Sequence, residues 1–281
     1  MKILEVNNLS KNFSLEQSLL LKLKNVFSKG KRDIPALKAL DDVSFFVNEG
    51  EILGVLGESG SGKSTLAKAI MGIVKPDIGE IMLFGENILG LSGNKRLEVM
   101  RSMQMIFQDP FSSLDPRMNV RQILLEPLKI HKLVPNNIDE FLTKQLEDVG
   151  LDSFALNCYP SEFSGGQRQR IGICRALILN PKLIIADEAV SALDVSVQAQ
   201  ILELLLKLQK TRNLSIIFIS HDVAVVRQIS HRIILLYKGR LVETIEADKL
   251  LVEAKHEYTK KLINAALYLR ENRHLSFTRK K

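Results

Sequence analysis

The sequence predicts an α/β fold whose central strands are parallel and covered on both faces. Two apolar runs, residues 183–186 and 216–219, are rich in β-branched residues and have the length of buried central strands. A third run, residues 52–56, leads through a glycine-rich loop into a helical pattern at residues 65–71. Between about residues 109 and 176 the pattern changes to helices. We therefore expect an α/β core that carries an inserted group of helices.

The part before the first central strand is β-rich. Residues 3–6 have a short strand pattern, and residues 43–47 alternate loosely before a turn at residues 48–50. The short run at residues 52–56 then starts the core. We expect these elements to form a β-rich N-terminal segment.

The helical block contains two segments with helical spacing, residues 119–125 and 138–149. Prolines are expected to punctuate the block at three positions: Pro127, Pro135 and Pro160. We interpret the block as a helical subdomain inserted between strands of one core.

The C-terminal third returns to the core pattern. Residues 197–209 carry an apolar stripe at helical spacing, which predicts a helix packed on the sheet. A turn at Lys238 and Gly239 predicts a hairpin. We expect one domain over residues 1–250, with its core at 1–108 and 177–250 and its helical subdomain at 109–176. We expect residues 251–281 to form a helical, basic tail.

The composition indicates a globular cytosolic protein. Hydrophobic residues make up 46% and charged residues 25% of the 281 positions. No apolar run approaches the ~20 residues that cross a bilayer, and residues 1–5 lack the pattern of a secretory signal. Cys158 and Cys174 lie far apart, so we interpret them as reduced thiols.

The formal net charge of +7 is concentrated in two segments. Residues 22–38 carry +5 and residues 255–281 carry +6, which leaves −4 for the rest of the chain. This distribution argues against a nucleic-acid-binding surface. The basic segments are either solvated surface or segments that lie near an anionic cytoplasmic membrane surface.

A glycine-rich loop at residues 57–64 matches the phosphate-loop pattern. Because it follows a predicted strand and opens a predicted helix, backbone N–H groups and the helix N-terminus can converge on phosphates. We expect Lys63 to neutralise β/γ-phosphate charge, Ser64 to ligate Mg²⁺ and Thr65 to contact the α/β-phosphates. The expected ATP-binding residues of this segment are Gly57, Glu58, Ser59, Gly60, Ser61, Gly62, Lys63, Ser64 and Thr65.

Two carboxylates, Asp187 and Glu188, directly follow the apolar run at residues 183–186. Open α/β sheets bind ligands at the carboxyl ends of their strands. We expect Asp187 to belong to the Mg²⁺ shell, and Glu188 to orient the attacking water and take its proton. An isolated Asp-Glu pair is more often a helix start, but the phosphate loop upstream favours the catalytic interpretation.

The string Phe-Ser-Gly-Gly-Gln-Arg-Gln-Arg at residues 163–170 combines a helix N-cap, Ser164, with a second anion site. It resembles the LSGGQ signature of ATP-binding cassette (ABC) ATPases. The resemblance implies a P-loop NTPase (RecA-like) core with an N-terminal antiparallel β subdomain and an inserted helical subdomain. It also implies a dimer that sandwiches two ATP molecules, in which the following residues act in trans: Ser164, Gly165, Gly166 and Gln167.

Three further family motifs follow in order. Gln108 resembles the Q-loop glutamine, a catalytic residue and Mg²⁺ ligand, and Asp194 belongs to a D-loop string at residues 191–194. His221 follows the strand at residues 216–219, where the family has its switch histidine. A lone histidine there is usually structural, but the resemblance implies that His221 contacts the γ-phosphate.

Longer strings at residues 104–120, 190–202 and 256–259 resemble the oligopeptide, dipeptide and nickel importer ATPases. Gln167 in place of methionine resembles the "F" member of that family's two unlike ATPase subunits. The resemblance implies peptide uptake driven by hydrolysis of ATP with Mg²⁺ as cofactor, at the cytoplasmic face of the cell membrane. It implies as partners a second ATPase subunit, two transmembrane permeases and an extracellular binding protein, with no nucleic acid. A homodimer, and nickel or a metal chelate as substrate, stay open.

Some features depart from the family pattern. Ala189 stands where the family usually has proline, but Glu188 is retained, so we expect hydrolysis to survive. An insertion at residues 14–35 interrupts the region of the adenine-stacking aromatic. We choose Phe13 for that role, against an ordinary core phenylalanine. A soluble ABC ATPase is a distant alternative. Such proteins normally carry long coiled-coil insertions or two cassettes in one chain, and neither fits 281 residues with a short helical insertion.

Overall fold

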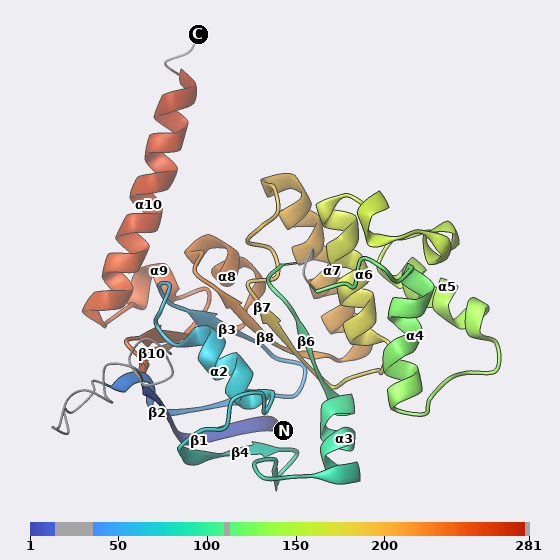
Figure 1. Ribbon diagram of the computed structural model, residues 1–281. Coiled ribbons are helices and arrows are strands. Elements are labelled where there is room, and N and C mark those ends of the chain that lie inside the picture. The colour runs from blue at the N-terminus through green and yellow to red at the C-terminus, as the bar shows by residue number, and fades with distance from the viewer. Residues whose placement is uncertain (15–35, 110–112, 279–281) are drawn as a thin grey trace, which may run out of the picture.

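The computed structural model describes the backbone of residues 1–14, 36–109 and 113–278. Two β-sheets stack against one another, helices cover the larger sheet, and the last helix projects away from the body (Figure 1). Of the predicted insertion at residues 14–35, all but Ser14 lies outside the described residues, as do the last three residues of the tail.

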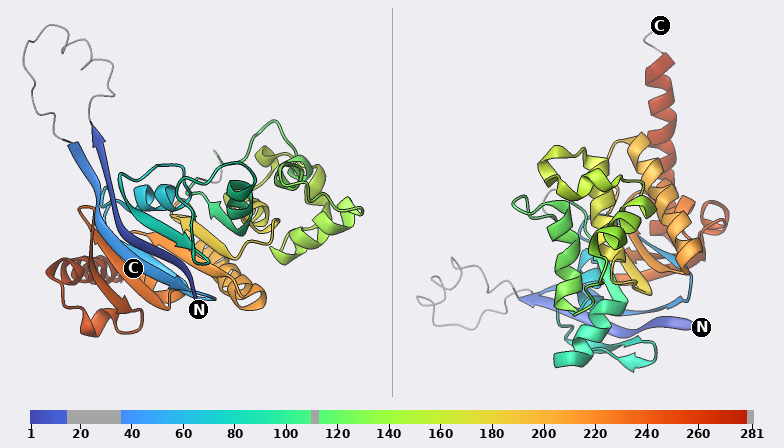
Figure 2. Two further views of the ribbon diagram at one scale, coloured as in Figure 1. Left: turned by 90° about the horizontal axis from the view of Figure 1, so that it is seen from below. Right: turned by 90° about the vertical axis from the view of Figure 1, so that its right-hand side faces the viewer.

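The smaller sheet is antiparallel and has the order β2-β1-β4-β5. Its strands are β1 (Lys2–Ser14), β2 (Ala36–Asn48), β4 (Ile78–Leu83) and β5 (Glu86–Asn87). Leu4 and Val6 of β1 are fully buried against the larger sheet. The first two strands are longer than the sequence patterns at residues 3–6 and 43–47 indicate, and they project together at one end (Figure 2).

The larger sheet has the order β10-β9-β3-β8-β7-β6. Its strands are β3 (Ile52–Leu56), β6 (Met103–Ile106), β7 (Leu183–Asp187), β8 (Ser215–Ser220), β9 (Arg232–Tyr237) and β10 (Arg240–Glu246). All neighbours pair in parallel except β9 and β10. Every residue of β3, β7 and β8 is buried, which confirms that the apolar runs are central strands.

The helices are α2 (Lys63–Ile70), α3 (Gly93–Ser102), α4 (Val120–Ile130), α5 (Ile138–Asp148), α6 (Gly165–Leu177), α7 (Val195–Arg212), α8 (Val223–Ile229), α9 (Leu250–Glu253) and α10 (Glu257–Thr278). Helices α2, α5 and α7 begin and end within three residues of the predicted segments, α4 continues five residues beyond its predicted segment, and α3 and α8 lie where no helix is predicted from the sequence. Pro127 lies inside α4, so the expectation that it punctuates the helical block is wrong. Across the described part of the chain, no helix is both long and apolar enough to cross a membrane.

Alternate residues of the larger sheet face two hydrophobic cores. Ile184 and Ile216 pack toward α4, α6 and α7, whereas Ile185 and Ile217 pack toward the smaller sheet and α2. The helices α4–α6 follow β6 and precede β7 in the chain, as the sequence predicts, and they share the first core with the sheet. The subdomain boundaries themselves stay a prediction.

An ion pair between Glu51, which directly precedes β3, and Arg232 of β9 lies where the larger sheet meets β2 of the smaller sheet. Arg232 Nε lies 2.9 Å from Glu51 Oε1, and its Nη2 donates to Glu51 Oε2 at 3.1 Å and to Phe46 O at 2.7 Å. The guanidinium also stacks on the Phe46 ring, 4.3 Å from its centroid. Both charged side chains are largely buried, so each depends on the other.

We expect Glu51→Ala to lower the free energy of unfolding by about 2 kcal/mol, because Arg232 is left without its carboxylate in a largely buried position. Urea unfolding followed by circular dichroism measures the change. Glu49→Ala, at an exposed neighbouring position, is the matched control. An equal loss in both variants would contradict the assigned role of the pair.

Candidate functional site

The phosphate loop, residues 57–64, runs from the end of β3 into the first turn of α2, as the sequence predicts. Gly62 has φ +108°, and a side chain at this position would place its Cβ 2.4 Å from Ala39 O. A Cβ at Gly57 would lie 2.4 Å from Leu236 O. The two glycines therefore let neighbouring strands pack directly against the loop. Ser61 is buried, and its Oγ has no hydrogen-bond partner among the described atoms.

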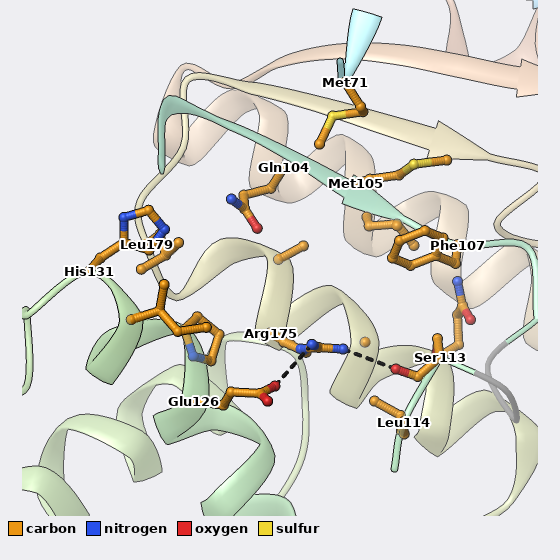
Figure 3. A pocket seen from close by; sticks show the side chains of 16 residues that line it. Met71, Gln104, Met105, Phe107, Ser113, Leu114, Glu126, His131, Arg175 and Leu179 are labelled. Atoms are coloured by element: carbon orange, nitrogen blue, oxygen red, sulfur yellow. Dashed lines mark hydrogen bonds and ion pairs between the residues drawn. The ribbon is translucent and has the colours of Figure 1, made fainter. Parts of the chain in front are cut away.

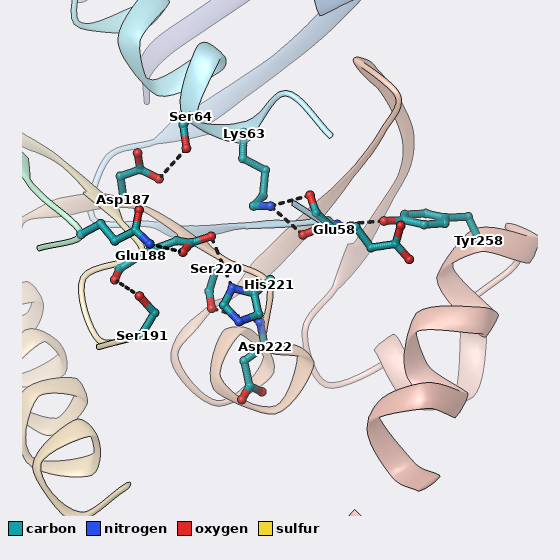
Figure 4. A network of polar contacts seen from close by, with 12 residues as sticks. Glu58, Lys63, Ser64, Asp187, Glu188, Ser191, Ser220, His221, Asp222 and Tyr258 are labelled. Carbon is teal, nitrogen blue, oxygen red and sulfur yellow. Dashed lines mark hydrogen bonds and ion pairs between the residues drawn. The ribbon is translucent and has the colours of Figure 1, made fainter. Parts of the chain in front are cut away.

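Lys63 is the buried cation of the loop. Its Nζ donates to Gly57 O at 2.7 Å and to Glu58 O at 2.9 Å (Figure 4). Burial lowers the pKa of Lys63, and the carboxylates of Glu188 and Asp187 oppose this change. The ammonium is thus held beside the loop backbone, where an anionic ligand of the loop would meet it.

Asp187 ends β7 next to the start of α2. Ser64 Oγ donates to Asp187 Oδ1 at 3.4 Å, so a hydroxyl and a carboxylate oxygen lie close enough to share one cation (Figure 4). Within the described chain, no group of three or more His, Cys, Asp or Glu side chains could hold a metal ion. These residues fit Mg²⁺, which is usually bound by one or two carboxylates plus substrate phosphates.

Burial raises the pKa of Asp187, and nearby Glu188 adds to the increase, whereas Ser64 and the lysines at 63 and 68 oppose it. A carboxyl pKa that is raised on folding means that the native state binds the proton more tightly than the unfolded chain does. Ionised Asp187 therefore lowers stability at neutral pH. This loss of stability disappears as the pH falls from above the pKa of Asp187 in the folded protein to the lower pKa that the carboxyl group has in the unfolded chain.

We expect Asp187→Asn to raise the melting temperature of the nucleotide-free protein by roughly 2 °C at pH 7, because a buried charge is removed. The difference from the wild type should shrink as the pH falls from 8 to 5. Thermal unfolding in the presence of a chelator measures both effects, with exposed Asp248→Asn as control. A variant less stable than the wild type at pH 7 would show that the Asp187 charge does not destabilise the fold.

Glu188 follows Asp187 and is held by two other predicted site residues. Gln108 Nε2 donates to Glu188 Oε2 at 2.8 Å, and His221 Nδ1 lies 3.3 Å from Glu188 Oε1 (Figure 4). Glu188 has φ +48°, an uncommon conformation that its neighbours must stabilise. The Ser191 hydroxyl and amide both donate to its carbonyl oxygen. The structure thus brings Gln108, Glu188 and His221 together.

The signature residues lie elsewhere, at the start of α6. Ser164 caps the helix: its Oγ accepts from the Gln167 amide at 3.3 Å, and Gln167 Oε1 accepts from the Ser164 amide at 2.9 Å. A Cβ at Gly166 would lie 2.4 Å from Val197 Cγ1, so this glycine lets α6 approach α7. Gly165 lies beside Leu193, and Asp194 caps α7 by accepting from the Val197 amide. These structural roles do not test action in trans.

The remaining predicted residues have less defined surroundings. Ser59 and Gly60 are exposed at the tip of the loop, and Thr65 is partly buried in the first turn of α2. Phe13 is 39% exposed near the end of β1, opposite Leu37, with Lys11 Nζ 5.5 Å from its ring centroid. Its stacking on adenine stays a prediction.

One contact of the loop was not predicted from the sequence. The hydroxyl of Tyr258, from the first turn of α10, accepts a hydrogen bond from the Glu58 amide at 2.9 Å (Figure 4). The available signal was the string at residues 256–259, which contains this tyrosine and resembles the importer ATPases.

The fold and this arrangement define a P-loop nucleoside triphosphatase. The family described as ABC transporter matches residues 40–191. Oligopeptide transport ATP-binding protein OppF of Haemophilus influenzae is 48% identical over 265 residues, covering 94% of this chain and 77% of that protein. OppF of Bacillus subtilis is 50% identical over 232 residues, covering 82% and 76%.

Two solved structures are similar over most of the chain. The dimeric ATP-binding cassette MJ0796, bound to ADP and Pi, gives a TM-score of 0.71 at 27% identity, covering 87% of this chain and 98% of that one. The cbiO1 protein from Clostridium perfringens gives 0.74 at 25% identity, covering 98% of both chains. The chain belongs to the ABC transporter family, as an ATPase of that family.

Proposed function

We propose that this chain is the ATP-hydrolysing subunit of an importer that takes up peptides. Its relatives of 48–50% identity are oligopeptide transport ATP-binding proteins. The observation that carries the ATP-hydrolysing role is the joint contact of Gln108 and His221 with Glu188, beside Lys63 and Asp187; the peptide-uptake role rests on the relatives.

In this proposal the phosphate loop and Lys63 bind the β/γ-phosphates, and Thr65 contacts the α/β-phosphates. Mg²⁺ held by Ser64, Asp187 and Gln108 would offset phosphate charge. Glu188 orients the attacking water and accepts its proton. Gln108 and His221 fix the carboxylate, and His221 is also the γ-phosphate contact. Phe13 is the proposed adenine-stacking residue.

The proposed active unit is a dimer, because one chain supplies only one face of each ATP site. Ser164, Gly165, Gly166 and Gln167 lie at the positive N-terminus of α6, which suits an anion on a partner subunit. Asp194 lies at the neighbouring start of α7. The dimeric state of the similar MJ0796 cassette supports this arrangement. A sister ATPase subunit is the proposed partner, and a homodimer is the alternative.

A cavity of about 230 Å³ beside the Q-loop supports a permease contact. Residues of β6, α4 and α6 line it, and Arg175 joins its walls by donating to Ser113 O at 2.9 Å and to Glu126 at 3.1 Å (Figure 3). Gln169 also lines it, and its buried Nε2 has no partner among the described atoms. Because Phe107 forms one wall, a permease segment seated here would adjoin Gln108.

The test is reconstitution of the chain in liposomes with the sister ATPase, two permeases and the binding protein. The two ATPase subunits lie on the side of the bilayer that corresponds to the cytoplasm, and the binding protein lies on the opposite side. We expect an oligopeptide to stimulate ATP hydrolysis severalfold and Ni²⁺ to have no effect. Stimulation by Ni²⁺ alone would refute the proposed substrate class. Failure of the assembled complex to hydrolyse ATP would refute the proposed function.

A further inference from the structure

The C-terminal helix α10 is tied directly to the phosphate loop. Tyr258 lies in its first turn, is 7% exposed, and accepts the hydrogen bond of the Glu58 amide across 200 positions of sequence (Figure 4). Its ring packs on Tyr237 with the centroids 4.1 Å apart. The hydroxyl is therefore held in place by an aromatic pair in which Tyr258 is buried and Tyr237 is partly buried.

The first turn of α10 is itself anchored to the larger sheet. Glu243 of β10 accepts from the Lys255 amide at 2.7 Å, from the His256 amide at 3.2 Å, and from the Thr259 hydroxyl. Thr259 is fully buried. Burial raises the pKa of Glu243, but its three hydrogen bonds outweigh burial and leave the pKa below the ordinary value. An ionised carboxylate thus fixes the position from which Tyr258 reaches the loop.

The peptide group between Gly57 and Glu58 is held from both ends. Its N–H donates to the Tyr258 hydroxyl, and its carbonyl oxygen, Gly57 O, accepts from Lys63 Nζ at 2.7 Å. Glu58 O accepts a second hydrogen bond from Lys63. Hydrogen bonds in such a chain polarise one another. Loss of the hydroxyl would free one end of the peptide that positions the ammonium.

We propose that Tyr258 is a positioning residue of the phosphate loop, through which α10 sets the affinity of the site for nucleotide. The inference rests on the phosphate-binding role proposed above for residues 57–64. A displacement of α10 would weaken nucleotide binding without touching the residues around Glu188.

The first test compares Tyr258→Phe with Tyr237→Phe in the full chain. Both variants lose one hydroxyl and keep the aromatic pair. We expect Tyr258→Phe to raise the Kd for Mg²⁺·AMP-PNP and the KM for ATP about threefold to tenfold, the range for one lost hydrogen bond. The kcat should stay within twofold, and Tyr237→Phe should bind like the wild type. An unchanged Kd in Tyr258→Phe, or an equal change in both variants, overturns the inference.

A second test adds Glu243→Gln, which weakens the anchor of α10 at a distance from the loop. We expect it to raise the Kd in the wild-type background and to add nothing in the Tyr258→Phe background. If the effects of Glu243→Gln and Tyr258→Phe on the free energy of nucleotide binding simply add in the double variant, α10 does not act on the loop through Tyr258 and the inference is overturned. If wild-type protein does not bind AMP-PNP, or Lys63→Met binds it equally well, the proposed function fails as well. If nucleotide binding depends on Lys63 but is unchanged by Tyr258→Phe, the inference about Tyr258 is refuted and the proposed function is not.

Discussion

Glu188→Gln is expected to reduce the turnover of ATP about 10³-fold while leaving ATP binding intact, which is within the range for loss of a general base. The amide has nearly the shape of the carboxylate, but it cannot accept a proton from water. Gln108 and His221 lie at 2.8 and 3.3 Å from the two carboxylate oxygens, so the side-chain position should be largely kept. Single-turnover hydrolysis, with nucleotide binding measured separately, distinguishes the two effects.

Glu203→Gln is the matched control for this variant, because it makes the same change on the exposed face of α7. Its turnover should equal that of the wild type. If Glu188→Gln hydrolyses ATP at the wild-type rate, Glu188 is not the base. If it loses nucleotide binding too, the carboxylate acts in binding rather than in the chemical step.

The components of the site that the sequence predicts are those that depend on local pattern. The phosphate loop needs only a strand, glycines and a helix start, all of which are contiguous. Parallel strands then bring their carboxyl ends to one edge of the sheet. Because β3 neighbours β8, and β8 neighbours β7, Gly57, His221 and Asp187 meet there.

The elements that the sequence does not predict depend on tertiary contacts. Strand β6 has only four residues, and β4 contains Gly79 at φ +107°, which weakens its alternating pattern. Pro127 is accommodated inside α4, where packing maintains the helix. The contact of Tyr258 with Glu58 joins residues 200 positions apart, and no local periodicity indicates such a pair.

Lys63→Met is expected to weaken binding of Mg²⁺·AMP-PNP about 100-fold or more, since hydrogen bonds to charged groups contribute about 1.5–3 kcal/mol each. Methionine keeps most of the buried stem, so the nucleotide-free protein should stay folded. The variant lacks the cation that lies next to Gly57 O and Glu58 O and faces the charges of Asp187 and Glu188. Titration calorimetry measures the affinity, and thermal unfolding checks the fold.

Lys75→Met serves as the control, because it removes an exposed lysine shortly after the same helix. If only the total positive charge mattered, both variants would bind nucleotide slightly more weakly. The effect would be small because exposed charges are screened by water and salt. A defect confined to Lys63→Met shows that affinity depends on a desolvated ammonium at one place in the loop. Equal affinity in Lys63→Met and the wild type would mean that nucleotide binds elsewhere, and the assignment of residues 57–64 would then be wrong.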